Sequence, residues 1–342
     1  MTIRIGIIGA GNISRTHARA ALDIAGVELV AHWSRSHHRA DAMAAEFGGR
    51  AFATLDELVA HRPMDFVIVG TPSGLHAEHA AAAARSGLHV LVEKPLDIST
   101  ERVDRLLGEC ERHRATIGVI FQDRTAPHLA WLRDRIAAGD LGRLLEISAE
   151  LRWYRPPEYY AESSWRGTWA FDGGGALMNQ GAHTVDLLLW LAGDVDRVSA
   201  TTRTSLHSIE VEDTAVAFLE YANGAVGTLE VTTAAYPGFP RRITVTGSEG
   251  TIVVEGDRVT TIALRGDMSP PPAQDVNRNP STSSPVVSDV TGHRRVIADF
   301  VESLETGRAP LCDGRDGRRS VALIEAAYES ARAPSHRGSD SK

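Results

Sequence analysis

The chain has very little lysine. Of its 36 cationic side chains, only Lys94 and Lys342 are lysines, and all the others are arginines. Lysine differs from arginine because its head group is compact and can lose its proton near neutral pH when it is desolvated. One internal lysine in such a chain indicates a position where arginine would not serve, although an arginine-biased codon pool could also leave one lysine behind.

Cysteine and long apolar runs are also scarce. Cys110 and Cys312 are too few and too far apart for a disulfide framework or a cysteine-based zinc site, so we expect inert thiols and no metal centre. No apolar run approaches the roughly 18 residues that span a bilayer. The sequence starts with an apolar strand and shows no signal-peptide layout, which predicts a cytoplasmic protein that binds no membrane.

An excess of positive charge is missing as well. The net charge is −8, and the arginines form no long run, which argues against binding to nucleic acid. A chain of 342 residues is long enough for about two domains with substantial cores. We place the domains at residues 1–122 and 123–332, followed by a flexible tail at 333–342.

Strand-like and helical segments alternate over the first 120 residues, which predicts an α/β fold with a doubly wound parallel sheet of the Rossmann type. The expected helices cover 13–25, 39–47, 75–86 and 100–113. The expected strands are Ile3 to Ile8, Val27 to Trp33, Phe66 to Val69, His89 to Val92 and Thr116 to Ile120.

From Leu144 onward the strands become longer and hairpin turns appear. Asn223-Gly224 is such a turn, between Thr214 to Tyr221 and Ala225 to Thr233. We therefore expect a C-terminal α/β domain with a large, mainly antiparallel open sheet. Residues 266–289 are rich in Pro, Ser and Asn and predict a surface loop.

A glycine-rich turn follows the first strand. In Gly9-Ala10-Gly11-Asn12-Ile13-Ser14 the first glycine permits a tight turn and the second lets a pyrophosphate approach the backbone. Ser14 is small, as packing of a helix on a strand requires. The segment predicts a dinucleotide site formed by Gly9, Gly11, Asn12 and Ile13.

The end of the second strand indicates which dinucleotide binds. An NAD site would place Asp or Glu there, but this chain has Ser34 and Arg35, with Arg39 nearby. Arg35 can bind a 2′-phosphate, which favours NADP over NAD, unless Arg35 only stacks on adenine or faces solvent.

Two further motifs carry candidate reactive groups. Glu93-Lys94-Pro95 and Thr71-Pro72 each end a strand, so they lie at the carboxyl edge of the sheet, where ligands bind. Far downstream, three glycines at 173–175 precede Asn179, His183 and Asp186. The glycines allow a ligand to approach closely, Asn179 and His183 would share a helix face, and Asp186 could orient the His183 ring.

Together these motifs resemble the glucose-fructose oxidoreductase and inositol dehydrogenase (Gfo/Idh/MocA) family over nearly the whole chain. The resemblance rests on the glycine turn, Thr71-Pro72 with His76, the Glu-Lys-Pro motif, Gln122 with Arg124, and the segment that ends in His183 and Asp186. It implies an NAD(P)-dependent oxidoreductase whose C-terminal sheet forms a subunit interface, so we expect a homodimer or homotetramer. It also implies catalysis by Lys94 and His183. Many members have Asp where this chain has Asn179.

Aromatic residues cluster between Trp153 and Trp169, where six of the chain's twenty lie within seventeen positions. Aromatic faces pack on sugar rings, and arginines donate to hydroxyls or anions. An interface between domains or subunits would explain the cluster equally well. We list as substrate-binding candidates Gln122, Arg124, Trp153, Tyr160, Trp165, Arg166 and Asn179.

These observations predict a dehydrogenase or reductase acting on a secondary hydroxyl or ketone of a sugar, a cyclitol or a sugar derivative. Lys94, His183 and Asn179 would carry catalysis. The cofactor would contact Lys94 as well, together with Ser34, Thr71, Pro72, His76 and Glu93. The alternatives are a dihydrodiol-type dehydrogenase, an NAD-using glycosidase, and a non-catalytic nucleotide sensor of the same fold.

Overall fold

The computed structural model describes residues 2–266, 271 and 289–333. The first half forms a six-stranded sheet in which all neighbouring strands are parallel. Its strand order reverses between β1 and β4, as in doubly wound dinucleotide-binding folds. Across the sheet the strands are β3 (Arg50–Ala51), β2 (Val27–Trp33), β1 (Ile3–Ile8), β4 (Phe66–Val69), β5 (His89–Val92) and β6 (Ile117–Val119).

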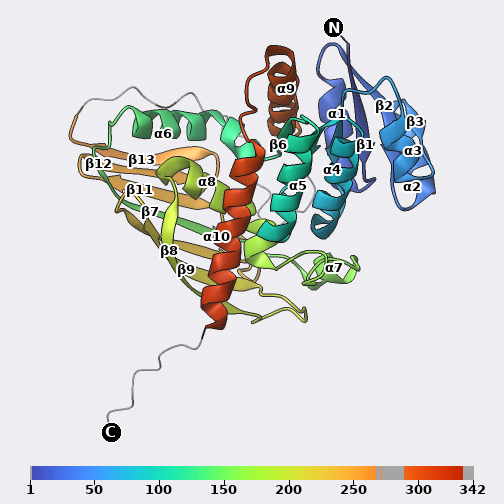
Figure 1. Cartoon of the computed structure of the whole chain (residues 1–342). Helices are drawn as coiled ribbons and strands as arrows, with labels where there is room; N and C mark the ends of the chain where they lie inside the picture. The colour runs from blue at the N-terminus through green and yellow to red at the C-terminus, as the bar shows by residue number, and fades with distance from the viewer. Residues whose placement is uncertain (1, 267–270, 272–288, 334–342) are drawn as a thin grey trace.

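Helices cover both faces of this sheet (Figure 1), as its continuous apolar strands require. One face packs against α3 (Leu55–Ala60), α4 (His76–Arg85) and α5 (Thr100–Arg112). The other packs against α1 (Asn12–Leu22), α2 (His37–Phe47) and α9 (Thr291–Thr306). Helix α9 follows the second sheet in the sequence, and its Phe300 ring lies 5.0 Å from that of Phe66.

The second half forms a seven-stranded sheet. Its pairs are antiparallel except for β10 with β7, which is parallel. In order across the sheet the strands are β13 (Arg258–Leu264), β12 (Gly250–Glu255), β11 (Arg242–Gly247), β7 (Leu144–Arg152), β10 (Val226–Thr232), β9 (Thr214–Tyr221) and β8 (Val195–Arg203).

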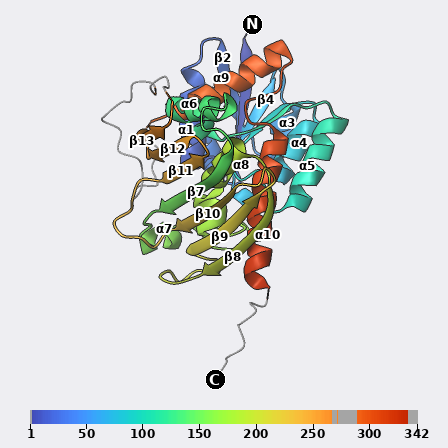
Figure 2. The same cartoon turned by 90° about the vertical axis from the view of Figure 1, so that its left-hand side faces the viewer.

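One face of this sheet forms the largest core cluster with α6 (Pro127–Ala137), α8 (Ala182–Ala192) and α10 (Gly314–Arg332). Helix α10 lies between the two sheets and contributes side chains to the cores of both. Strands β7 to β11 are seen from their other face in Figure 2. Alternation along β9 exposes Val216 and Phe218, while their neighbours Ala215 and Ala217 are buried.

The fold predicted from the sequence is confirmed, including the hairpin of β9 and β10. The elements β3 and α3, each six residues or shorter, were not predicted, and β6 is shorter than expected. Nearly all of the predicted surface loop, and the predicted tail beyond residue 333, lie outside the described residues. Within the described residues, no helix is long and apolar enough to cross a membrane.

Candidate active site

The glycine-rich turn connects β1 to α1. Gly9 has φ +115, and a Cβ there would lie 2.6 Å from the carbonyl oxygen of Gly70. A Cβ on Gly11 would meet no atom within 4 Å, and Gly11 precedes α1 without a side-chain cap. The N-terminus of α1 therefore has space in front of Gly11 and no side-chain cap, with Asn12 exposed and Ile13 half-buried on the first turn. Free N–H groups at a helix N-terminus attract anions such as a pyrophosphate. The buried Ser14 hydroxyl donates to the Gly70 carbonyl oxygen at 3.3 Å, which fixes α1 on the end of β4.

The end of β2 lies at the outer edge of the same turn. Gly9 N donates to the carbonyl oxygen of Trp33 at 2.8 Å, so the residues that follow β2 start beside the glycine turn. Ser34 is half-buried, and Arg35 and Arg39 are exposed.

The segment after β4 is braced by His76. Its Nδ1 lies 2.7 Å from the Pro95 carbonyl oxygen, and its Nε2 lies 2.8 Å from the Thr71 carbonyl oxygen. We expected His76 to contact the cofactor, but its buried ring instead connects the two turns at the carboxyl ends of β4 and β5. Thr71 and Pro72 remain half-buried on this edge.

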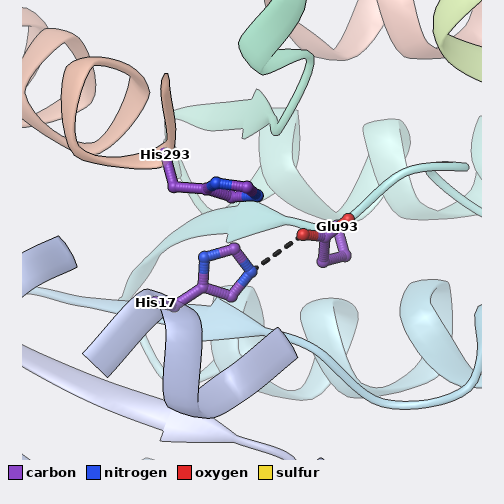
Figure 3. Close-up of side chains that lie close together, drawn as sticks. All are labelled: His17, Glu93 and His293. Carbon is purple, nitrogen blue, oxygen red and sulfur yellow. Dashed lines mark hydrogen bonds and ion pairs between the residues drawn. The ribbon is translucent and has the colours of Figure 1, made fainter. Parts of the chain in front are cut away.

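Glu93 lies beneath this edge with two histidines (Figure 3). Its Oε1 is 2.8 Å from His17 Nε2, and its Oε2 accepts from the backbone N–H of Lys94 at 2.9 Å. Burial would raise the pKa of Glu93, but the His17 hydrogen bond and the positive charges around the carboxylate lower it to about 2. Glu93 was expected to contact cofactor; here its carboxylate is buried and holds the backbone of Lys94.

The same three side chains could in principle hold a metal ion, since one ligand atom of each lies within 4.8 Å of the others. Metal-bound histidines, however, usually donate their second ring nitrogen to a carboxylate or carbonyl. Among the described residues, Nδ1 of His17 and Nδ1 of His293 have no such partner. His17 and Glu93 form a buried histidine–carboxylate pair, and the His293 ring lies 5.3 Å from the His17 ring.

Lys94 joins the two halves of the site. Its ammonium donates to the backbone carbonyl of Asn179 at 2.7 Å, so the lysine at the end of β5 meets the glycine-rich segment of the second half. Burial lowers the pKa of Lys94, and the carboxylates of Glu93 and Asp172 oppose that effect. The amine can therefore exchange a proton nearer to neutral pH than an exposed lysine can.

Asn179 is held by a buried acid that the sequence analysis did not single out. Asp172 Oδ1 accepts from Asn179 Nδ2 at 2.6 Å, and Oδ2 accepts from Gly167 N at 2.9 Å. Burial raises the pKa of Asp172 to about 6 in spite of these bonds and of Lys94. Its position directly before the three glycines was the available signal.

His183 lies on the first turn of α8, close to Gln122. The nitrogen atoms Gln122 Nε2 and His183 Nε2 are 3.4 Å apart. Burial lowers the pKa of His183 to about 4, against the negative charge of Asp123, so the ring is neutral at pH 7 and can accept a proton. Asn179 does not share the helix, because it lies on a separate π-helical turn at Ala176–Gln180.

Arg124 and Asp186 bind each other. Arg124 Nε donates to Asp186 Oδ2 at 2.9 Å and Nη2 donates to Oδ1 at 2.5 Å, while Nη1 donates to Asp316 at 3.0 Å. Arg124 was expected to bind substrate and Asp186 to orient His183. Both side chains are buried and bind each other instead of a substrate or His183. Their contacts hold the turn before α6 against α8 and α10.

The three glycines approach protein rather than ligand. A Cβ at Gly173 would overlap Ile98, one at Gly174 the Tyr328 hydroxyl, and one at Gly175 the Glu212 carbonyl. The Glu212 carboxylate accepts from the backbone N–H groups of Gly175 at 2.9 Å and Leu177 at 2.8 Å. The glycines thus let the turn that carries Asn179 pack closely, which corrects our interpretation of them as a ligand contact.

The aromatic segment borders this turn. Arg155 lies 5.0 Å over the Trp153 ring, and Arg166 lies 4.3 Å over the Tyr159 ring. Gln180 links the cluster to Asn179, because its amide donates to the Tyr159 hydroxyl at 2.9 Å and to Asn179 Oδ1 at 3.1 Å.

The remaining aromatic candidates are distributed around the cluster. The Tyr160 hydroxyl is 2.9 Å from Thr233 Oγ1, and Trp165 lies 5.5 Å from the Arg166 guanidinium. Trp169 instead packs on Tyr328 of α10, with ring centroids 5.3 Å apart. Only part of the segment is therefore close to Lys94 and Asn179.

A parallel sheet with the strand order of dinucleotide-binding folds, and a reactive side chain such as Lys94 at its carboxyl edge, is typical of NAD-binding oxidoreductases. Residues 3–121 match the model of an oxidoreductase family with an NAD-binding Rossmann fold, and residues 129–253 match the model of the GFO/IDH/MocA C-terminal domain. The chain belongs to the GFO/IDH/MocA family of oxidoreductases.

Several relatives cover most of the chain. It is 28% identical to inositol 2-dehydrogenase of Rhizobium meliloti (strain 1021), over 96% of this chain and 97% of the relative. It is 30% identical to the rhizopine catabolism protein MocA of Rhizobium meliloti, over 72% and 76%. The crystal structure of the WlbA dehydrogenase from Bordetella pertussis in complex with NADH and UDP-GlcNAcA superposes with a TM-score of 0.87 at 34% identity, covering 97% of both chains.

Proposed function

We propose that this oxidoreductase transfers a hydride between a nicotinamide cofactor and a secondary hydroxyl or ketone of a sugar, cyclitol or sugar derivative, with Lys94 and His183 handling the proton. The observation that carries the proposal is the contact of Lys94 with Asn179, 2.7 Å long, which brings the lysine of the first sheet to the turn that precedes His183. Of the relatives named above, one is an inositol dehydrogenase and another was crystallised with UDP-GlcNAcA, and both names support this proposal.

The chain's own residues divide the proton chemistry between them. In the oxidation direction, the Lys94 amine accepts a hydrogen bond and then the proton from the substrate hydroxyl, because burial lowers the pKa of this amine. His183 is neutral and exchanges that proton onward, while Asn179 fixes the neighbouring hydroxyl. When bound, the nicotinamide ring supplies the hydride acceptor or donor.

We propose NADP as the preferred cofactor. The proposal is supported by the absence of Asp and Glu from the residues that directly follow β2, and by the exposed Arg35 and Arg39 beside the glycine turn. NAD is the competing choice, favoured by the NADH in the crystal structure of the Bordetella pertussis relative.

The substrate pocket, the assembly and the location are further proposals. We propose that Trp153, Tyr160, Trp165, Arg166 and Gln122 contact the substrate, since the arginine–aromatic cluster adjoins Asn179 through Gln180. We propose a homodimer or homotetramer formed through the second sheet, supported by the exposed Val216 and Phe218. The domain limits at residues 122 and 332 and the cytoplasmic location rest on the sequence alone.

The test is absorbance of NADPH and NADH followed with the purified full chain across sugars, inositols, nucleotide sugars and diols. We expect turnover with at least one polyhydroxylated compound, and loss of that turnover in Lys94→Met. Binding of the cofactor without turnover on any compound in the panel would contradict the proposal and favour a nucleotide sensor.

A further inference from the structure

The charges of four side chains act on the Lys94 ammonium, and three of these side chains are engaged with other partners. Glu93 is hydrogen bonded to His17 and to the Lys94 backbone. Asp123 is paired with Arg241 at 2.6 Å, and Arg155 donates to Gln180 at 3.0 Å. The fourth group is Asp172, and its negative charge raises the pKa of Lys94.

Asp172 is bonded differently from the other two carboxylates. It is 1% exposed, and both of its hydrogen bonds come from neutral donors, the Gly167 backbone and the Asn179 amide. The charged groups that face it are Lys94 and Arg166, and neither makes a direct hydrogen bond to it among the described residues. A buried carboxylate without an ion-pair partner in contact costs free energy, so its retention beside the proposed catalytic lysine calls for a functional reason.

The hydrogen bonds give that reason. The carboxylate holds the Asn179 side chain at 2.6 Å, and the backbone carbonyl of the same residue holds Lys94 at 2.7 Å. Asp172 therefore acts on the lysine in two ways, by fixing the residue that contacts the ammonium and by placing a negative charge near it.

We propose that Asp172 is a positioning residue of the reaction, which anchors Asn179 against Lys94 and balances the positive charge that the lysine gains when it takes the substrate proton. This inference rests on the proposed function. In oxidation, the O–H bond of the substrate breaks and an N–H bond forms on Lys94. The new ammonium is then stabilised by the carboxylate across the Asn179 bridge, and reduction runs in the opposite sense.

The scarcity of lysine makes a direct measurement possible. Protein labelled with 13C at lysine Cε gives only two resonances, from Lys94 and Lys342, and Lys342→Arg assigns them. The titration midpoint of Lys94 is followed in the full chain without cofactor or substrate. Asp172→Asn should lower that midpoint by about one pH unit, because it removes an opposite charge that acts on a half-buried ammonium.

A charge transposition provides the second arm. The double variant Asp172→Asn with Asn179→Asp keeps one carboxylate, one amide and the hydrogen bond between them. Its Lys94 midpoint should return at least halfway to the wild-type value. In turnover assays, Asp172→Asn should lower kcat about tenfold or more with unchanged cofactor affinity, and the double variant should recover part of that loss.

Glu212→Gln is the matched control. Glu212 is a buried carboxylate that holds the same turn through Gly175 and Leu177, so its neutralisation loosens the turn without removing charge from beside Lys94. We expect its Lys94 midpoint to equal that of the wild type. If Asp172→Asn does not fold, Asp172→Ser, which can still accept from Asn179, must lower the midpoint instead.

An unchanged Lys94 midpoint in the folded Asp172 variant, or an equal shift in Glu212→Gln, would overturn the inference. Because the titration uses no cofactor and no substrate, its result is independent of the proposed function. An absence of turnover in the wild type would overturn the proposed function while leaving the link between Asp172 and Lys94 intact.

Discussion

Replacement of Lys94 by arginine separates charge from proton transfer. Arginine keeps the positive charge, and it can donate to the Asn179 carbonyl that Lys94 now contacts at 2.7 Å. It cannot release a proton in the working pH range, however, and its planar head is larger than an ammonium group. If Lys94 is present because the chemistry needs a compact group that sheds its proton, Lys94→Arg should fold, bind cofactor and be almost inactive.

We expect kcat of Lys94→Arg to fall by about two orders of magnitude or more, the range for loss of a positioned acid or base, which equals about 2.7 kcal/mol of barrier. The assay is steady-state NAD(P)H absorbance with the best substrate of the panel. Cofactor affinity from fluorescence and the thermal midpoint of unfolding should stay close to the wild-type values.

The control exchanges the same two residue types at a distant site. Arg318→Lys alters an exposed cation on α10 that pairs with Asp104, and it should leave kcat unchanged. Turnover of Lys94→Arg near the wild-type rate would refute the catalytic assignment, and the single internal lysine would then be an accident of codon usage.

Four further predictions follow from the site. His183→Ala should lower kcat as much as Lys94→Arg, and the double variant should be little slower than either single variant, because the two residues act as one relay; independent, multiplying losses would argue against the relay. Arg35→Ala should weaken NADPH about tenfold or more in fluorescence titrations and barely change NADH, whereas equal wild-type affinities for the two cofactors would rule out the phosphate contact. Trp165→Ala should raise KM without changing cofactor affinity; an altered oligomeric state with the same KM, measured by light scattering, would identify an interface residue instead. The folded-state pKa of Glu93, about 2, lies below its usual value of 4.5, so its ionised form adds stability above pH 4.5 that is lost as the pH falls towards 2. Between pH 4.5 and pH 2, the free energy of unfolding of Glu93→Gln should fall by up to about 3 kcal/mol less than that of the wild type. The same pH dependence in both proteins would disprove the effect.

The sequence was sufficient wherever the determining interactions are local. The strands of the first sheet are short apolar runs between turn residues, and the glycine turn needs Gly9 for its own backbone geometry. The β9–β10 hairpin is determined by the Asn223-Gly224 turn in the same way. Lys94 could be singled out from the sequence because counting lysines requires no knowledge of which residues lie near it.

Interactions between distant segments were not predictable from spacing. From the sequence we expected Arg124 to bind substrate. In the structure its guanidinium binds Asp186 and Asp316, which lie on two other helices. Three consecutive glycines allow any close approach, and nothing local distinguishes a ligand from Ile98 or Tyr328. The role inferred for Asp172 depends on Asn179 lying opposite it, and that is a property of the folded turn alone.

The return of α9 to the first sheet affects how the protein is made. Val296, Ile297 and Phe300 complete the apolar layer over Ile5 and Ile68, yet the ribosome adds them after every strand of the second sheet. Until then, one face of the nascent nucleotide-binding sheet is partly uncovered while the whole second sheet emerges. The first sheet therefore reaches its finished form only after the whole second sheet has been synthesised, and interrupted translation products would present that uncovered apolar face to chaperones and proteases.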